Sequence, residues 1–495
     1  MFTHPSPSWP LLRGAGHLGL LLLVVGCSRT GGSQTAPEQV PVEMAPFAGL
    51  VEELVRASLT DGQAYEKLAL LCRVAPHRLS GSQGADRAVE WARETMIRDG
   101  LENVRLEPVL VPCWERGDTA QLEILEPPMP SGEGELRILA LGGSVGTPGE
   151  GIVAGVVEVT SFEELANLGG AARGKLVLFN RPMDPALVNT FAAYGGSVGQ
   201  RGQGAIEAAR VGAVGALVRS MTTLRDDSPH TGAMHYEEGV DKVPSVAVST
   251  LGAEKLSGLL RDHPGRVRMR LRLDCRTLPD RPSANVVGEI RGREKPEEIV
   301  LIGGHLDAWD VGEGAHDDGS GCCQVLEAAR LLLASGLRPR RTLRVVLFLN
   351  EENGLRGAQA YYETHLEELP LHVMALESDR GGFTPRGFTT DGNPRAAAML
   401  AAASSLLSSI GCSDMLPGSG GADVSPLRRK GVVTVGLYPD CQRYFDVHHS
   451  ENDILAAVNE RELELGAVAI AALAYVVADL PERLPPNEVT DGESR

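Results

Sequence analysis

The chain has 495 residues, a formal net charge of −18 and a hydrophobic content of 43%. This length exceeds what one ordinary core needs and is typical of about three domains, while the hydrophobic fraction is that of a globular protein. The acidic charge argues against a nucleic-acid-binding protein, because such proteins carry basic patches. The eight cysteines include no CxxC pair, so we expect no cysteine-only zinc site.

The first 26 residues are typical of a secretory signal. Arg13 precedes an apolar stretch over residues 18–25, which is too short to cross a bilayer. The sequence VVGC at residues 24–27 resembles a bacterial lipobox and implies cleavage before Cys27 and lipid attachment there, with a plain signal peptide as the alternative. Residues 27–46 are predicted to be a flexible linker. We therefore expect an exported protein held at the bacterial cell envelope by a lipid, or secreted if the lipobox is not used.

Residues 47–118 and 281–480 are predicted to form one domain, which residues 119–280 interrupt. In the first part, apolar residues at helical spacing predict helices, including one from Gly84 to Asp99, and Asn103–Val111 alternates like a strand. A turn-rich loop, PHRLSGS, occupies residues 76–82.

The interrupting segment, residues 119–280, consists of short apolar runs between Gly and Pro turns. This pattern predicts a small β-rich domain with one helix near residues 204–211. In position and composition the segment resembles a protease-associated domain, a module inserted into secreted peptidases. His230 and His235 lie in a polar loop, and we expect both to be solvent-exposed.

Strand and helix alternate along residues 281–480, which predicts an α/β fold with a mostly parallel sheet sandwiched by helices. The predicted strands are 299–302, 342–349, 371–376 and 432–437. A long amphipathic helix over residues 460–480 is expected to close the domain, and residues 481–495 are predicted to be a tail.

Acidic and histidine side chains follow these strands, at or just beyond the point where each ends. They are His305, Asp307, Asp317, Glu351, Glu352, Asp379 and His449. Ligands in open α/β sheets bind at the carboxyl ends of the strands, so we expect these side chains to meet. Two histidines and several carboxylates suit zinc or a similar divalent ion. Two metal ions about 3.5–4 Å apart, sharing a bridging carboxylate, would use this set well.

The same residues lie in an ordered series of motifs between His305 and Asp453: HLDAWD, DDGSG, NEENG, ESD and HHSEND. This series resembles the di-zinc aminopeptidase and carboxypeptidase Q family of metallopeptidases. The stretches GGHLDAWDVGEGAHDDGSG, ESDRGG and HHSENDI are most similar to its carboxypeptidase Q members. The loop at residues 76–82 and the inserted segment share in the resemblance, which covers most of the mature chain and implies a zinc-exopeptidase-like fold.

The resemblance implies a role for each of these residues. Asp317 would bridge two zinc ions, with His305 and Asp379 completing one site and Glu352 and His449 completing the other. Glu351 would be the general base that takes a proton from water. Asp307 would assist catalysis by fixing the His305 imidazole.

The two adjacent histidines leave an alternative open. The HxxxD spacing to Asp453 favours His449 over His448 as the ligand, and Asp453 would then steady His449. Some relatives carry a tyrosine, thought to steady the oxyanion, at the position of His448, so His448 either takes that part or only packs. No family role falls on His316.

Together these inferences predict a lipid-anchored exopeptidase with two Zn²⁺ per chain that hydrolyses short peptides. The resemblance to carboxypeptidase Q implies dipeptides with free ends and a homodimer, and an aminopeptidase acting on longer peptides is an alternative. A single-zinc acyltransferase of the glutaminyl cyclase kind and a catalytically inactive receptor or scaffold are further alternatives. Both are disfavoured, because the predicted ligands and Glu351 are all present.

Overall fold

The computed structural model describes residues 43–489. The predicted signal, Cys27 and most of the predicted linker lie outside the described residues. None of the helices in the described part of the chain is long and apolar enough to cross a membrane.

Several helices form where apolar residues at helical spacing follow a capping side chain. Ser82, for example, caps the predicted helix at residues 84–99 by accepting a hydrogen bond from the Ala85 amide. The helices are α1 (Ala45–Asp61), α2 (Ala64–Val74), α3 (Gln83–Arg98), α4 (Phe162–Leu168), α5 (Thr190–Gly195), α6 (Gly199–Arg210), α7 (Thr250–Asp262), α8 (Ser320–Ala334), α9 (Arg356–Thr364), α10 (Pro394–Ser404), α11 (Tyr444–Val447) and α12 (Glu460–Asp479).

The strands form two eight-stranded sheets. They are β1 (Glu102–Glu115), β2 (Ala120–Glu126), β3 (Glu135–Leu136), β4 (Ile138–Ala140), β5 (Ile152–Val159), β6 (Leu176–Phe179), β7 (Gly215–Arg219), β8 (Ser245–Val248), β9 (Arg268–Leu273), β10 (Arg276–Ile290), β11 (Lys295–His305), β12 (Arg341–Phe348), β13 (His372–Glu377), β14 (Pro385–Thr390), β15 (Asp414–Pro417) and β16 (Val433–Pro439).

The first sheet has the strand order β1-β10-β12-β11-β13-β16-β14-β15. Its central strands β12, β11, β13 and β16 are parallel, whereas β10 and β14 run antiparallel to their central neighbours. The predicted α/β architecture is confirmed, with the parallel pairing concentrated at the centre. The sequence pattern did not predict β14 and β15, because these short strands lack the continuous apolar run of the central ones.

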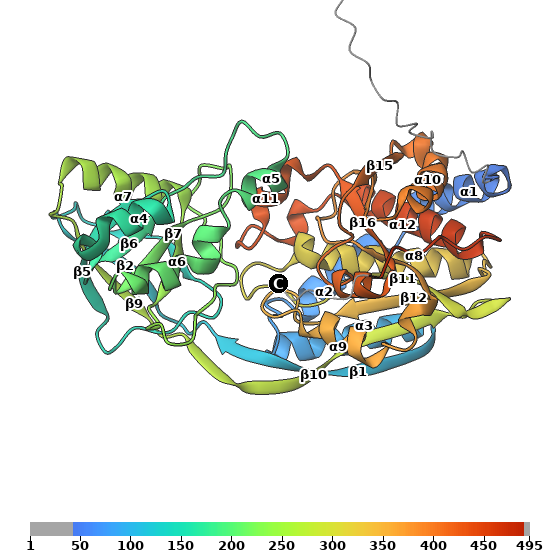
Figure 1. Ribbon diagram of the computed structural model, residues 1–495, viewed down its shortest axis with the longest axis horizontal. Coiled ribbons are helices and arrows are strands. Elements are labelled where there is room, and N and C mark those ends of the chain that lie inside the picture. Colours follow the sequence, from blue (N-terminus) through green and yellow to red (C-terminus); the bar gives the residue numbers. More distant parts are fainter. Residues whose placement is uncertain (1–42, 490–495) are drawn as a thin grey trace, which may run out of the picture. The chain divides into compact units, whose positions relative to one another are not determined.

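Helices cover both faces of this sheet (Figure 1). On one face α1, α2, α3, α8, α10 and α12 share a large apolar core with the strands. Residues 466–478 of α12 are buried around the whole helix, as expected of a helix that is apolar on all sides. The opposite face has a smaller core in which Tyr361 of α9 packs against Phe348 of β12.

The second sheet comes from the inserted segment and has the order β3-β2-β9-β5-β6-β7-β8-β4. The chain leaves the first sheet at the end of β1 and returns at the start of β10, where Glu115 pairs with Arg276 (Figure 1). The eight strands confirm the expected β-rich domain, but four helices, α4 to α7, also lie in this segment, so the expectation of one helix was wrong. The missed helices are short or, like α7, rich in Gly and Ser. The resemblance to a protease-associated domain stays a prediction.

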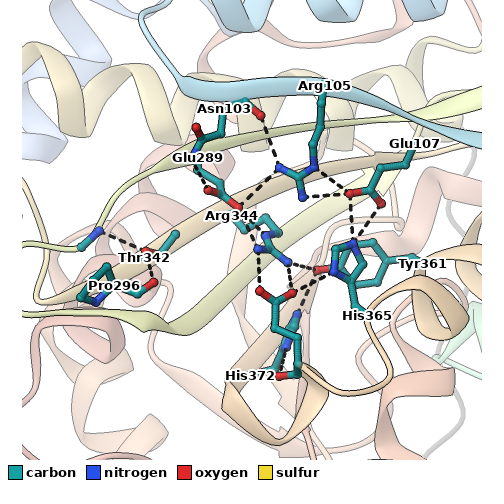
Figure 2. A network of polar contacts seen from close by, with 12 residues as sticks. Asn103, Arg105, Glu107, Glu289, Pro296, Thr342, Arg344, Tyr361, His365 and His372 are labelled. Carbon is teal, nitrogen blue, oxygen red and sulfur yellow. Dashed lines mark hydrogen bonds and ion pairs between the residues drawn. The ribbon is translucent and has the colours of Figure 1, made fainter.

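A buried polar network ties β1, β10 and β12 to α9 (Figure 2). The Arg344 guanidinium donates hydrogen bonds to Glu289 at 2.8 Å, to the Tyr361 hydroxyl at 3.0 Å and to Glu368 at 2.7 Å. Next to it, the His365 ring bridges Glu368 at 2.8 Å and Glu107 at 3.0 Å. Each buried charge in this network is therefore paired, which is the condition for tolerating it away from water.

We predict that His365 makes the stability of the fold depend on pH. Burial alone would lower the pKa of His365, but its hydrogen bonds to Glu107 and Glu368 outweigh burial and raise it. The stabilisation by the charged ring is complete below the unfolded-state pKa of about 6.5 and is lost as the pH rises through the raised value. His365→Gln should lower the free energy of unfolding at pH 6 by about 1–3 kcal/mol, and by less at pH 9.

Denaturant unfolding at several pH values measures this effect. His263→Gln, in the half-buried residue after α7, is the matched control and should leave the pH profile unchanged. A stability loss in His365→Gln that is the same at every pH would contradict the prediction.

Candidate metal centre

Polar side chains gather at one edge of the first sheet, where the parallel strands end. They are His305 at the end of β11, Asp317 in the turn before α8, Glu351 and Glu352 after β12, Asp379 after β13, and His448 and His449 after α11. Parallel strands present their carboxyl ends at a common edge, and this geometry brings together residues far apart in the chain, as the strand-end pattern predicted.

Asp317 lies at the centre of the group. Its Oδ1 is 3.2 Å from His305 Nε2 and its Oδ2 is 3.2 Å from His449 Nε2. On one side His305 Nε2 also lies 3.4 Å from Asp379, and on the other His449 Nε2 lies 3.0 Å from Glu352. The Asp317 carboxylate thus separates two pairs of donors, one of His305 and Asp379 and one of His449 and Glu352.

Two neighbouring residues are placed less well to bind a metal, although both lie among the clustered donors. Both oxygens of Asp318 are engaged by backbone amides, of His305 at 3.1 Å and of Gly321 at 3.0 Å. His448 lies 3.6 Å from Asp317 and stacks on the His449 ring. His449, unlike His448, contacts both Asp317 and Glu352.

The electrostatics of the site are those of a cation-binding centre. Burial alone would lower the pKa of both His305 and His449. Asp379 raises that of His305 well above its usual range, and Glu352 raises that of His449, to about 10. Burial favours a neutral Asp317, yet the two rings hold its pKa well below normal. The acidic groups therefore stabilise positive charge at this edge strongly.

Asp307 positions two parts of the site with different atoms. Its main-chain oxygen lies 3.0 Å from His305 Nδ1 and orients the ring. Its carboxylate accepts hydrogen bonds from the amides of Asn350 at 2.7 Å and Glu351 at 3.1 Å, and from the Ser80 hydroxyl at 3.1 Å. The expected fixing of the imidazole thus comes from the carbonyl, while the carboxylate holds the turn that carries Glu351.

Asp453 also acts on the backbone rather than on a histidine ring. Its two oxygens accept hydrogen bonds from the amides of His316 at 2.7 Å and Asp317 at 3.1 Å. The His316 ring accepts from the Gly382 amide at 3.1 Å and stacks on Phe383. The expectation that Asp453 steadies His449 was wrong, and His316, to which no role had been given, anchors the turn that presents Asp317.

Arg78 holds the loop between His305 and Asp317. This side chain is fully buried and donates to the carbonyl oxygens of Leu306 at 2.7 Å, Glu313 at 2.6 Å and Gly314 at 2.6 Å. The only indication of its importance in the sequence was its place in the loop at residues 76–82, which shares in the family resemblance. Nothing in the sequence indicated which groups Arg78 would bind.

The inserted segment contributes directly to the site. The His230 Nδ1 atom lies 2.7 Å from the His448 carbonyl oxygen, and the Thr231 amide donates to the His449 carbonyl oxygen at 2.9 Å. His449 has a φ of 60°, a left-handed conformation that needs such support in a non-glycine residue. His230 is 2% exposed, so its expected solvent exposure was wrong, whereas His235 is exposed as expected.

A cavity of about 620 Å³ opens at this edge, between the cluster of histidine and carboxylate side chains and the inserted segment. From the cluster it is lined by Asp317, Glu351, Glu352, Asp379, His448 and His449, and from the inserted segment by Phe191, Tyr194, Arg201 and His235. This volume suits a small ligand rather than a folded protein.

Comparisons with known proteins agree with this arrangement. The model of peptidase family M28 matches residues 285–474. Carboxypeptidase Q of Bos taurus is 38% identical over 92% of this chain and 94% of its own length. Carboxypeptidase Q of Homo sapiens is also 38% identical, over 95% of this chain and 98% of its own length. A peptidase M28 precursor from Shewanella amazonensis superimposes with a TM-score of 0.86 at 34% identity, over 90% of this chain and 100% of that one. A zinc aminopeptidase from Bacillus subtilis, at 18% identity, shares the fold with a TM-score of 0.63. The superposition covers 86% of this chain and 97% of that one.

We predict that His230 supports metal binding through the His448–His449 turn. His230→Ala removes the donor to the His448 carbonyl and should weaken binding of a divalent metal about tenfold, as loss of outer contacts does at other metal sites. His230→Asn, whose amide nitrogen can stand near the position of Nδ1, should restore part of the affinity.

Metal retained after dialysis against a chelator series measures the affinity. His235→Ala, from the exposed end of the same segment, is the control and should retain metal like the wild type. Equal retention by His230→Ala and the wild type would rule out this positioning role.

Proposed function

The chain belongs to peptidase family M28 as a relative of carboxypeptidase Q, and from this premise we propose that it is a di-zinc exopeptidase hydrolysing short peptides. The observation that carries the proposal is the Asp317 carboxylate, each oxygen of which faces a different histidine at 3.2 Å. A cleft of about 620 Å³ beside it supports a small peptide as substrate.

The residues fit a pair of zinc ions. His305 and Asp379 would hold one ion and His449 and Glu352 the other, with Asp317 between them. Imidazole nitrogens and carboxylate oxygens are ligands that zinc accepts, and Glu352 Oε1 is buried without a hydrogen-bond partner in the part of the chain that the structure describes. Zinc at such a site polarises a carbonyl oxygen and lowers the pKa of water.

Glu351 is suited to move the proton in this reaction. It lines the cavity, and the hydrogen bond from its amide to Asp307 fixes its backbone. Burial raises the pKa of the Glu351 carboxyl, and repulsion from Asp379 and Glu352 adds to the increase. A carboxylate with a raised pKa takes up a proton more readily near neutral pH and can return it to the leaving amine.

We predict that Glu351→Gln retains zinc but loses hydrolysis of a dipeptide by at least about 100-fold, because general acid–base catalysis contributes that much. Elemental analysis of both proteins should give two zinc ions per chain. Glu363→Gln, on the exposed face of α9, is the control. One zinc per chain would favour a glutaminyl cyclase-like enzyme and none an inactive relative. Wild-type turnover in Glu351→Gln would exclude Glu351 as the base.

We further propose that the protein is exported and anchored by a lipid at Cys27, which the sequence VVGC at residues 24–27 supports. Such an anchor would place the peptidase at the bacterial cell envelope, on the periplasmic or outer-membrane face. A homodimer, implied by the resemblance, stays a prediction.

For this anchor we predict that Cys27→Ser shifts the expressed protein from the membrane fraction to the soluble fraction, because the thiol that carries the lipid is removed. Fractionation and immunoblotting measure the shift. Cys441→Ser, at a half-buried cysteine, is the control and should stay with the membrane. Recovery of Cys27→Ser in the membrane fraction would refute the anchor.

A further inference from the structure

Arg201 of α6 is a buried cation without a carboxylate partner. The residue is 8% exposed, and it makes no ion pair within residues 43–489. Its Nη2 donates to the Tyr194 hydroxyl at 2.7 Å, and its Nη1 lies at the long distance of 3.4 Å from the Thr231 carbonyl oxygen. Its Nε is buried with no hydrogen-bond partner among the residues described.

Other buried arginines in the molecule are satisfied differently. Arg344 pairs with Glu289 and Glu368 at 2.8 and 2.7 Å, and Arg78 donates to three carbonyl oxygens at 2.6–2.7 Å. A buried charge is costly unless it is paired. Arg219 and Arg341 also have an unmatched donor, but each has a carboxylate partner. The lack of such a partner at Arg201 therefore indicates a missing anion rather than a structural role.

The position of Arg201 relates this missing anion to the reaction centre. Its Nη1 lies 3.4 Å from Nδ1 of His449, the ring whose Nε2 faces Asp317 and Glu352. Both contacts of Nη1, to His449 Nδ1 and to the Thr231 carbonyl oxygen, are long at 3.4 Å. Nη1 is therefore available to donate a stronger hydrogen bond to a group in the cleft.

Arg201 is also the one lysine or arginine among the described residues that line this cavity. The same cavity is also lined by Asp317, Glu351, Glu352 and Asp379, which repel an anion. Space for the guanidinium depends on Gly232, where a Cβ would stand 2.3 Å from Nη1 and where φ is 131°. The cleft thus holds a positively charged side chain in a fixed position next to a group of acidic side chains.

From these contacts we propose that Arg201 binds the free α-carboxylate of the substrate, so that the cleft selects peptides with an unblocked carboxyl end. Arginine suits this task because its planar fork donates two hydrogen bonds to one carboxylate. Only the His449 ring separates Nη1 from the Asp317–Glu352 side of the cluster, a span on the scale of one residue. The bond beside the last residue is therefore the one presented for cleavage. This inference rests on the proposed peptidase function.

The test compares one dipeptide with its carboxyl-terminal amide, using the zinc-loaded full chain. Wild type should prefer the free carboxylate. Arg201→Met should lower kcat/KM for the free dipeptide about 100-fold, the scale of losing one partner of a buried ion pair, and leave turnover of the amide and zinc content unchanged. Arg201→Lys should recover part of the loss.

Two further variants keep the test decisive. Arg173→Met, at an exposed arginine of the inserted segment, is the matched control and should behave like the wild type. If Arg201→Met does not fold, Tyr194→Phe removes the hydroxyl that holds Nη2 and should reduce the preference for the free carboxylate. Equal losses on the free dipeptide and the amide, or no preference in the wild type, would overturn the proposal.

Binding separates failure of this inference from failure of the proposed function. Calorimetry measures affinity of both peptides for Glu351→Gln, with and without Arg201→Met. Tighter binding of the free dipeptide that depends on Arg201 supports the carboxylate site even if the wild type hydrolyses neither peptide, a result that would refute the peptidase. Equal binding of both peptides would overturn the carboxylate site whatever the activity.

Discussion

The carboxylate of Asp317 lies between two imidazole rings, with Asp379 beside one ring and Glu352 beside the other, and this arrangement places strong demands on the surrounding fold. Buried like charges repel one another and each costs several kcal/mol unless it is compensated. Such a cluster persists only if its supporting backbone is held firmly. The parallel centre of the sheet supplies part of that rigidity, because β11, β12 and β13 fix where their carboxyl ends lie.

The loops after those strands obtain the rest of their rigidity from side chains that bind backbone groups. Asp307 holds the amides of the Glu351 turn, and Asp453 holds those of the Asp317 turn. Arg78 binds three carbonyl oxygens in the loop that connects His305 to Asp317. The acidic residues of this edge thus divide into two kinds. Some face the cleft, and others accept hydrogen bonds from loop amides that have no partner in a strand or helix. Charge alone does not distinguish the two kinds.

This division explains how far the sequence could be interpreted. Apolar runs that end in His305, in Glu351–Glu352 and near Asp379 predicted both the central strands and the convergence of these side chains, because strand direction alone sets where they meet. The partners of Asp453 and Arg78 could not be predicted, since a hydrogen bond to a backbone amide or carbonyl leaves no pattern in side-chain types. His230 was misjudged for the same reason. Its neighbours in sequence are polar, but its burial comes from the His448 turn, more than 200 residues away.

The inserted segment therefore does more than line the cavity. Through Thr231 it supports the left-handed backbone of His449, and through Arg201 it adds a cation against the same ring. Both contacts act on His449, so a shift of the inserted segment would alter the orientation of the ring and the position of the cation together. A segment that carries both functions couples recognition of the substrate end to the geometry of the reaction centre. An unpaired buried arginine lowers the stability of the free protein, and it is retained at a functional site when the ligand supplies the missing charge.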